Sequence, residues 1–249
     1  MKQHDAVIKV MEAKGGYATL GFLYQQALKV GGVEWKTKTP FASIRRIVQD
    51  ERFFFKIRPG LWALKSWREK LPPEMVPAKT ESPAQRDFSH AYFQGLVVEI
   101  GNLQKYETFV PAQDRNKMFL GRENLGSLAT LTRIYPFCYS NIVNYAKTID
   151  VIWFNSRKMP ASLFEVEHST DMRSSLVKFI ELQDFRADMV IVADETRQRQ
   201  FQQTVSLTAF EPIRSFVRFL SYHHVSEYHS NLFKLRAIES EMKVPLRWR

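Results

Sequence analysis

LFEVEHST, residues 163–170, is the segment from which the fold of the C-terminal part of the chain can be inferred. Its β-branched and aromatic residues predict a buried strand, and side chains alternate along a strand, so Glu165 and Glu167 share one face. An ionised carboxylate that is buried without a partner is so unfavourable that it binds a proton or a cation instead. The pair therefore predicts a bound proton or cation at this place, next to His168.

A second strand-like segment, IDVIWF at 149–154, precedes the first and is separated from it by a short polar stretch. The two segments predict an antiparallel hairpin. With a turn centred near Lys158, position 150 lies opposite position 166, and Asp150 comes beside Glu165 and Glu167. Three carboxylates this close repel one another unless a cation or a shared proton relieves them, and an oxygen-rich site of this kind suits Mg²⁺ or Mn²⁺.

The composition predicts a folded protein in a reducing compartment. The chain has 249 residues, of which 45% are hydrophobic and 25% charged, enough for one large domain or two modest ones. Its apolar runs fall far short of the roughly 20 residues that cross a bilayer, and its first residues do not read as a secretory signal. Cys138 is the single cysteine, so no internal disulfide can form. We therefore expect a cytoplasmic protein without a membrane partner.

The positive charge of the chain is concentrated near its beginning. The formal net charge is +10, and residues 1–70 hold fourteen Lys and Arg against six Asp and Glu, whereas the remainder holds twenty-two against twenty. A solubilising surface would usually spread its charge, while a concentrated positive field favours a polyanion such as nucleic acid or an anionic membrane.

A proline-rich segment divides the chain. EKLPPEMVPAKTESPAQRDF, residues 69–88, holds four prolines among charged and small residues, which disfavours helix interiors and central strands. We therefore predict an N-terminal domain over residues 1–70, a linker over 71–89 and a C-terminal domain over 90–249.

The N-terminal domain shows the pattern of three helices and a hairpin. Apolar residues recur at helical spacing near the start and in LGFLYQQALKV, and Thr39 followed by Pro40 predicts the start of a third helix. FFFKI and LWAL then flank Arg58-Pro59-Gly60, where Pro-Gly favours a tight turn. Three helices and a hairpin predict a winged helix.

These residues also carry a family resemblance. DAVIKVMEAKGGYATLGFLYQQAL and TPFASIRRIVQDERFFFKIRPGLWAL resemble the helix-turn-helix module named for its occurrence in ASXL proteins and restriction endonucleases. The resemblance implies a winged helix that binds double-stranded DNA, with its third helix at the major groove and its wing on the backbone. The alternative is a solvated basic face on a winged helix that docks a protein. The expected DNA contacts are Lys36, Lys38, Ser43, Arg45, Arg46, Lys56 and Arg58.

The C-terminal domain resembles the PD-(D/E)XK nuclease core of restriction endonucleases, in which an Asp on one strand and an acidic residue on the next hold the metal. The resemblance covers most of residues 91–232 and implies an α/β fold, a restriction-endonuclease-like mixed sheet flanked by helices. It also implies that Asp150 bridges the metal ions, that Glu165 completes their coordination, and that Glu99 on the first helix adds a ligand directly or through water.

One position departs from the family pattern. Glu167 stands where the family usually has lysine, so it either orients the attacking water or binds metal, or it marks a weakened site. Lys178, one helix onward, is a candidate for a displaced positive charge. His168 and Ser169 follow the strand and either contact the scissile phosphate or have only a packing or capping role. The structural alternative for the acids is a salt-bridged sheet edge satisfied by Arg157 or Arg173.

The sequence thus predicts a sequence-specific, Mg²⁺-dependent DNA endonuclease of restriction type, for which Mn²⁺ is also suitable. Such a protein would act in the cytoplasm of a bacterial or archaeal cell, associated with the nucleoid. A homodimer is compatible with this reading because double-strand cleavage requires two active sites. The rivals are a catalytically inactive DNA-binding regulatory or architectural protein with a degenerate nuclease core, and an interaction module with no nucleic-acid partner.

Overall fold

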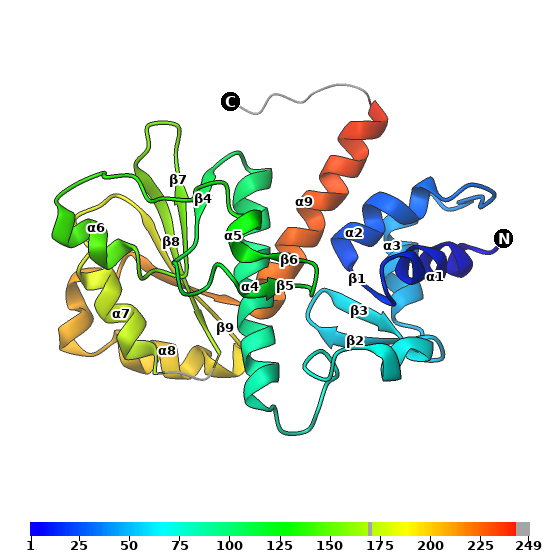
Figure 1. Ribbon diagram of the computed structural model, residues 1–249, viewed down its shortest axis with the longest axis horizontal. Coiled ribbons are helices and arrows are strands. Elements are labelled where there is room, and N and C mark those ends of the chain that lie inside the picture. Colours follow the sequence, from blue (N-terminus) through cyan, green and yellow to red (C-terminus); the bar gives the residue numbers. More distant parts are fainter. Residues whose placement is uncertain (169–170, 243–249) are drawn as a thin grey trace. The chain divides into compact units, whose positions relative to one another are not determined.

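The computed structural model describes residues 1–168 and 171–242 and forms two compact units (Figure 1). One unit contains the residues up to Ser82 together with the C-terminal helix from Ser226 onward, and the other contains Pro83–Val225. The predicted fold class is confirmed: an N-terminal winged helix is followed by a mixed sheet flanked by helices. None of the described helices is long and apolar enough to cross a membrane.

The N-terminal unit combines three helices with a small antiparallel sheet in the order β1-β3-β2. Strand β1, which pairs with β3, is too short to leave a pattern of its own and was not predicted. The elements are α1 (Gln3–Ala13), β1 (Tyr17–Thr19), α2 (Leu20–Gln26), η1 (Ala27–Lys29), α3 (Pro40–Val48), β2 (Phe54–Arg58), β3 (Leu61–Leu64) and η2 (Lys65–Lys70).

Helix α3 buries the face that its sequence predicts. Ile44 and Val48 are fully buried, and Phe41 packs against the same cluster. Pro40 occupies the first turn as expected, but the Thr39 side chain makes no capping bond. Its hydroxyl lies 3.3 Å from the Thr37 hydroxyl instead, so the start of the helix depends on the fixed backbone of the proline.

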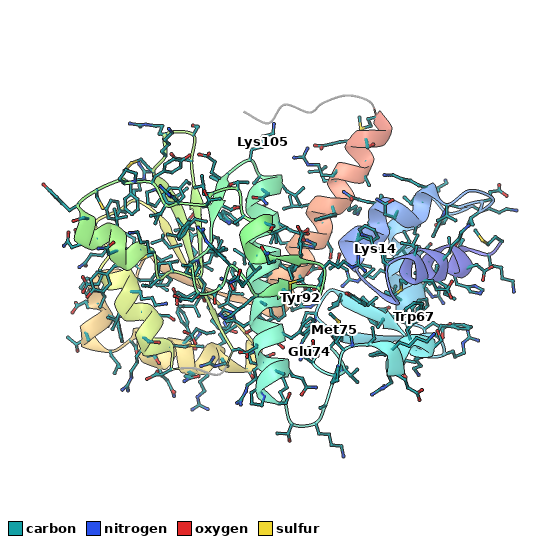
Figure 2. The ribbon with its side chains drawn as sticks, viewed as in Figure 1. Lys14, Trp67, Glu74, Met75, Tyr92 and Lys105 are labelled. Carbon is teal, nitrogen blue, oxygen red and sulfur yellow. The ribbon has the colours of Figure 1, made fainter. Side chains whose placement is uncertain are left out.

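Two glycines are required by the backbone of this unit. Gly60 follows Pro59 in the β2–β3 turn and has φ 76°, the combination of a type II turn. Gly16 has φ 88°, and a Cβ there would lie 2.5 Å from Cγ of Trp67, which is labelled in Figure 2. A side chain at residue 16 would therefore be strained by both its backbone and its neighbour.

The proline-rich segment is packed rather than extended into solvent. Met75, which is labelled in Figure 2, is fully buried, and Leu71 is buried as well. Helix α4 (Pro83–Leu103) begins inside the segment 71–89 that the sequence assigns to a linker, because a proline at the first helical position loses no hydrogen bond. The predicted domain boundaries stay a prediction.

The second unit is built around a five-stranded mixed sheet. Its elements are α4 (Pro83–Leu103), β4 (Glu107–Phe109), β5 (Met118–Phe119), β6 (Glu123–Asn124), α5 (Leu125–Leu128), α6 (Ser140–Ala146), β7 (Val151–Phe154), β8 (Pro160–Glu167), α7 (Met172–Ile180), β9 (Asp188–Ala193), η3 (Glu195–Arg197), α8 (Gln198–Val205), η4 (Thr208–Ile213), β10 (Val217–Ser221) and the first residues of α9 (Tyr222–Met242).

The strands of this sheet follow the order β10-β9-β8-β7-β4. Strands β8, β9 and β10 run parallel, while β7 is antiparallel to both of its neighbours, β8 and β4. The predicted β7–β8 hairpin is confirmed, but its register is one residue away from the prediction, since Val151 pairs with Phe164. An irregularity after Trp153 shifts the pairing, and Lys158 in the turn has φ 62°.

Helices cover both faces of the sheet (Figure 1). Helices α7 and α8 pack on one face through a cluster that includes Leu163 and Ile191. Helix α4 lies against the other face, where the Trp153 indole N–H donates to the Val97 carbonyl oxygen at 3.2 Å. Because residues alternate along β8, Glu165 and Glu167 lie on the α7 side of the sheet.

Candidate active site

A pocket of about 300 Å³ opens where β8 ends, and residues of α4 and α7 line it. It contains the three predicted carboxylates, Asp150, Glu165 and Glu167, all of them buried. The remaining lining residues are Arg86, Asp87, His90, Lys117, Val166, His168, Ser174, Ser175 and Lys178.

Asp150 lies directly before β7 and is held by β8. The Asp150 backbone N–H donates to Glu165 Oε1 at 3.3 Å, and the Val166 N–H donates to Asp150 Oδ2 at 2.8 Å. The sequence prediction paired position 150 with position 166. The observed register places it opposite Glu165 instead, and residues directly opposite in an antiparallel pair point to the same face. With the observed register, Asp150 and Glu165 therefore lie directly opposite each other on one face of the sheet.

Lys178 supplies the cation that Glu165 needs. From α7 its ammonium group lies 2.9 and 2.8 Å from the two Glu165 carboxylate oxygens, and it donates to the Thr148 carbonyl oxygen at 2.9 Å. The Ser175 hydroxyl, also on α7, donates to Glu165 Oε2 at 2.9 Å. Both oxygens of a carboxylate that is 2% exposed are thus satisfied by one helix.

Glu167 has different partners. Its Oε1 also lies within hydrogen-bonding distance of the Ser175 hydroxyl, whose single proton can be donated to Glu165 or to Glu167 but not to both. Its Oε2 lies 3.9 Å from Nη1 of Arg197. The same Arg197 nitrogen donates to the Glu167 carbonyl oxygen at 2.9 Å. Glu167, which stands where the family usually has lysine, is therefore paired with an arginine. This agrees in part with the salt-bridged alternative, although that alternative named Arg157 or Arg173 and not Arg197.

Burial and neighbouring charges shift the pKa values of Glu165 and Asp150 in opposite directions. Burial, followed by the charge of Asp150, raises the pKa of Glu165 to about 8 although Lys178 and Ser175 oppose the change. Burial also pushes the pKa of Asp150 upward, but His90 and the Val166 N–H outweigh it and the net shift is downward. For Lys178, burial lowers the pKa, yet the charge of Glu165 more than compensates and the pKa is raised. Asp150 is therefore the firmly ionised acid.

Helix α4 contributes His90 to the pocket and not Glu99. His90 Nε2 lies 3.3 Å from Asp150 Oδ2, and Asp87, one turn earlier, also lines the pocket. Glu99 is nine residues beyond His90, and at about 100° and 1.5 Å per residue it lies on the opposite side of the helix and about 13 Å further along. The prediction of Glu99 as a metal ligand therefore has no support in the pocket geometry.

Of the two residues expected after the strand, His168 lies at the pocket. His168 Nδ1 lies 3.3 Å from the Tyr222 hydroxyl, which in turn donates to the Glu167 carbonyl oxygen at 3.3 Å. Ser169 lies outside the described residues.

The predicted DNA contacts of the winged helix differ in their freedom to bind. Arg46, like Lys38, is exposed and has no ion-pair partner among the described residues. Arg45 is half-exposed and lies 3.6 Å from Glu227 on α9, within the same unit.

The remaining expected contacts follow the same division. Lys36 is exposed and lies 3.5 Å from Glu34, while Lys56 on the wing is exposed. The Ser43 hydroxyl donates to the Thr39 carbonyl oxygen at 3.4 Å. The Arg58 side chain is 10% exposed, and its Nη2 lies 2.9 Å from the carboxylate of Glu81. Arg58 is therefore already paired within the N-terminal unit.

The donor set of the pocket fits a hard divalent cation. Among the described residues there is no group of three or more His, Cys, Asp or Glu side chains arranged to hold a metal ion. Mg²⁺, however, is usually bound by one or two carboxylates that are completed by water and substrate phosphates. Asp150 Oδ1 accepts no hydrogen bond from the described chain and belongs to a residue that lines the pocket. Asp150 and Glu165 thus form a suitable two-carboxylate set.

Several site residues were not predicted from the sequence. Ser175 lies three residues before Lys178, which the sequence had offered as a candidate, so the two share a face of α7. A search for partners of Glu165 at this spacing would have found Ser175. His90 and Gln94 are four residues apart on α4, but this helix is apolar on several sides, and its sequence does not show which side meets the strand ends.

Comparisons with known proteins agree with the two-part architecture. Residues 70–244 match the family described as Type II restriction enzyme NmeDI C-terminal domain, and residues 1–67 match HARE-HTH, the HTH domain family of ASXL proteins and restriction endonucleases. The chain is 38% identical over 71 residues to the Type II restriction enzyme NmeDI of Neisseria meningitidis serogroup C, which covers 26% of this chain and 20% of that protein. The match thus spans about a fifth of the length of this relative. No solved structure matches the chain.

Proposed function

The chain belongs to the family of the Type II restriction enzyme NmeDI C-terminal domain, and we propose that it is a sequence-specific, metal-dependent endonuclease that hydrolyses phosphodiester bonds in duplex DNA. The observation that carries the proposal is the convergence of Asp150, Glu165 and Lys178 in one pocket at the end of β8. Two carboxylates and a lysine at this place are what the PD-(D/E)XK pattern requires, with the lysine supplied from α7.

Asp150 and Glu165 would hold Mg²⁺, or Mn²⁺ in its place. These residues would place at the scissile phosphate an ion that would supply Lewis-acid polarisation, a lowered pKa of the attacking water and stabilisation of the departing oxygen. Asp150 is suited to this role because its pKa is lowered and its Oδ1 accepts no bond from the described chain. Glu165 is oriented by the hydroxyl and ammonium groups of α7.

Lys178 takes the place of the lysine that the strand lacks. Its ammonium lies against both Glu165 oxygens and 27% of its side chain is exposed, so it can face a bound phosphate while it holds the acid. A fixed cation beside the phosphate stabilises the negative charge that develops on it during attack by water. Glu167, bound by Ser175 and Arg197, would fix the end of β8 in this account.

The N-terminal unit would bind the duplex. Its charge excess, the exposed Arg46 on α3 and the exposed Lys56 on the wing support contacts to bases and backbone phosphates. A homodimer would supply the second active site for cleavage of both strands.

One observation favours a second candidate, a DNA-binding protein whose nuclease core is inactive. Lys178 contacts both oxygens of Glu165, and Arg197 approaches Glu167, so neither acid is open in the way that a free metal ligand would be. This candidate predicts DNA binding that salt weakens and that neither metal nor the loss of Glu165 changes.

The cleavage test separates the two candidates. Purified wild type and Asp150→Ala are incubated with methylated and unmethylated genomic DNA in Mg²⁺ or EDTA, and the cut ends are mapped. The proposal expects discrete ends that appear only with wild type and Mg²⁺. Equal cutting by Asp150→Ala, or none by wild type on every DNA of the panel, would support the inactive protein.

A further inference from the structure

Lys117 brings a second ammonium group to the pocket. It follows β4 and directly precedes β5, and it lines the pocket together with Lys178. Its Nζ lies 2.7 Å from Asp114 Oδ1, and 36% of its side chain is exposed. Asp114 is the single partner of this ammonium in the described chain, so donors remain for a ligand.

Buried groups connect Lys117 to the main chain of Asp150. Asp114 is 3% exposed, and its Oδ2 accepts a hydrogen bond from Gln94 Nε2 at 3.0 Å. Gln94 is fully buried on α4, and the same nitrogen donates to the Asp150 carbonyl oxygen at 2.7 Å. This series of bonds offsets the conformational entropy that is lost when three side chains are ordered. It therefore fixes the lysine at a defined place relative to Asp150.

The charges of the pocket create a need for such a cation. Four carboxylates line it, and a DNA phosphate that enters brings further negative charge. Of the lysines and arginines there, Lys178 already contacts Glu165 through both oxygens. Arg86 is exposed on α4, whereas Lys117 is anchored by a buried acid. Lys117 is therefore held in place by a buried acid and, unlike Lys178, makes no polar contact with Glu165 in the part of the chain that the structure describes.

We propose that Lys117 binds a non-bridging oxygen of a DNA backbone phosphate at the pocket, with Asp114 and Gln94 setting its place relative to Asp150. The proposal rests on the proposed function in that the polyanion is duplex DNA. The competing explanation is that Lys117 has a purely structural role in the turn. Its backbone N–H donates to the Asp114 carbonyl oxygen at 2.9 Å, and its side chain contacts the carboxylate of the same residue. The two explanations differ in how DNA binding responds to salt.

The test measures that response with the full chain. Binding of a short mixed-sequence duplex is followed by fluorescence anisotropy in EDTA over a salt series for wild type, Lys117→Met and Lys117→Arg. The matched control is Lys147→Met, which removes an exposed ammonium that contacts Asn144 and does not line the pocket. Circular dichroism checks folding, and Lys117→Gln, which can still reach Asp114, replaces the methionine variant if that one does not fold.

Loss of one phosphate contact makes the slope of log affinity against log salt about 0.9 shallower. The ratio of wild-type affinity to variant affinity should therefore fall about 3.5-fold between about 50 and about 200 mM salt. We expect this change for Lys117→Met and a wild-type slope for Lys117→Arg and Lys147→Met. A wild-type slope for the folded neutral variant, or an equal change in the control, overturns the proposal. Because EDTA prevents metal-dependent cleavage, this outcome is independent of the cleavage test with Asp150→Ala.

Discussion

Glu165→Gln removes the buried group whose ionisation opposes folding. Glu165 is 2% exposed, and burial beside Asp150 raises its pKa to about 8 from an ordinary value of 4.5. Glutamine keeps the shape of the side chain and one acceptor for the hydroxyl and ammonium donors of α7, but it cannot ionise. The variant should therefore lose one component of the pH dependence of stability.

The sign and size of this component follow from the shift. Between pH 4.5 and 8 the native state keeps a proton on Glu165 that the unfolded chain releases, so the free energy of unfolding falls as pH rises through this range. One pH unit corresponds to about 1.4 kcal/mol, so wild type should lose about 2 to 3 kcal/mol between pH 5 and pH 7 relative to the variant. The pKa of Asp150 is lowered, so its effect lies at more acidic pH.

Chemical denaturation at pH 5 and pH 7, in EDTA so that no divalent ion binds, measures the difference. Glu123→Gln is the control, because this glutamate is exposed on β6 and its replacement should leave the pH dependence unchanged. Parallel pH profiles for wild type and Glu165→Gln would contradict a raised pKa, because they would mean that Glu165 ionises in the folded protein as readily as in the unfolded chain.

Three further substitutions test other parts of the structure. Lys178→Met should lower the cleavage rate by about 10²-fold, with partial retention in Lys178→Arg, in a plasmid-nicking assay. Arg46→Glu should weaken DNA binding about tenfold in a gel-shift assay, and Arg45→Glu less, because the carboxylate of α9 already offsets that charge. Gly16→Ala should lower unfolding stability by about 1 to 3 kcal/mol, whereas Gly31→Ala, with nothing within 4 Å of the added Cβ, should not lower it in the same thermal denaturation experiment.

Patterns within single segments predicted much of the fold. The hairpin of β7 and β8 follows from two short β-branched and aromatic runs, and the apolar face of α3 follows from helical spacing. The register was predicted one residue away because the turn was taken to be centred near Lys158, whereas Phe154 pairs with Pro160 and the turn is centred one residue earlier. Strand β1 was missed because three residues carry no period.

The site was predicted where its residues are close in sequence and missed where they come from distant helices. Asp150 and Glu165 are neighbours across one hairpin, so strand geometry was enough to bring them together. Choosing between Glu99 and His90 requires the rotation of α4 against the sheet, which depends on how its apolar residues pack. Lys178 was identified only as a candidate, because the contact with Glu165 depends on where α7 lies over β8.

The most direct test of the account is Mn²⁺ binding, followed by electron paramagnetic resonance with a short duplex present, for wild type, Asp150→Asn and Glu99→Gln. If Asp150 holds the ion, Asp150→Asn should weaken binding at least about tenfold, as expected for loss of a charged ligand, while Glu99→Gln should bind as wild type does. Equal binding by wild type and Asp150→Asn would contradict the claim that a divalent ion is held at the end of β8.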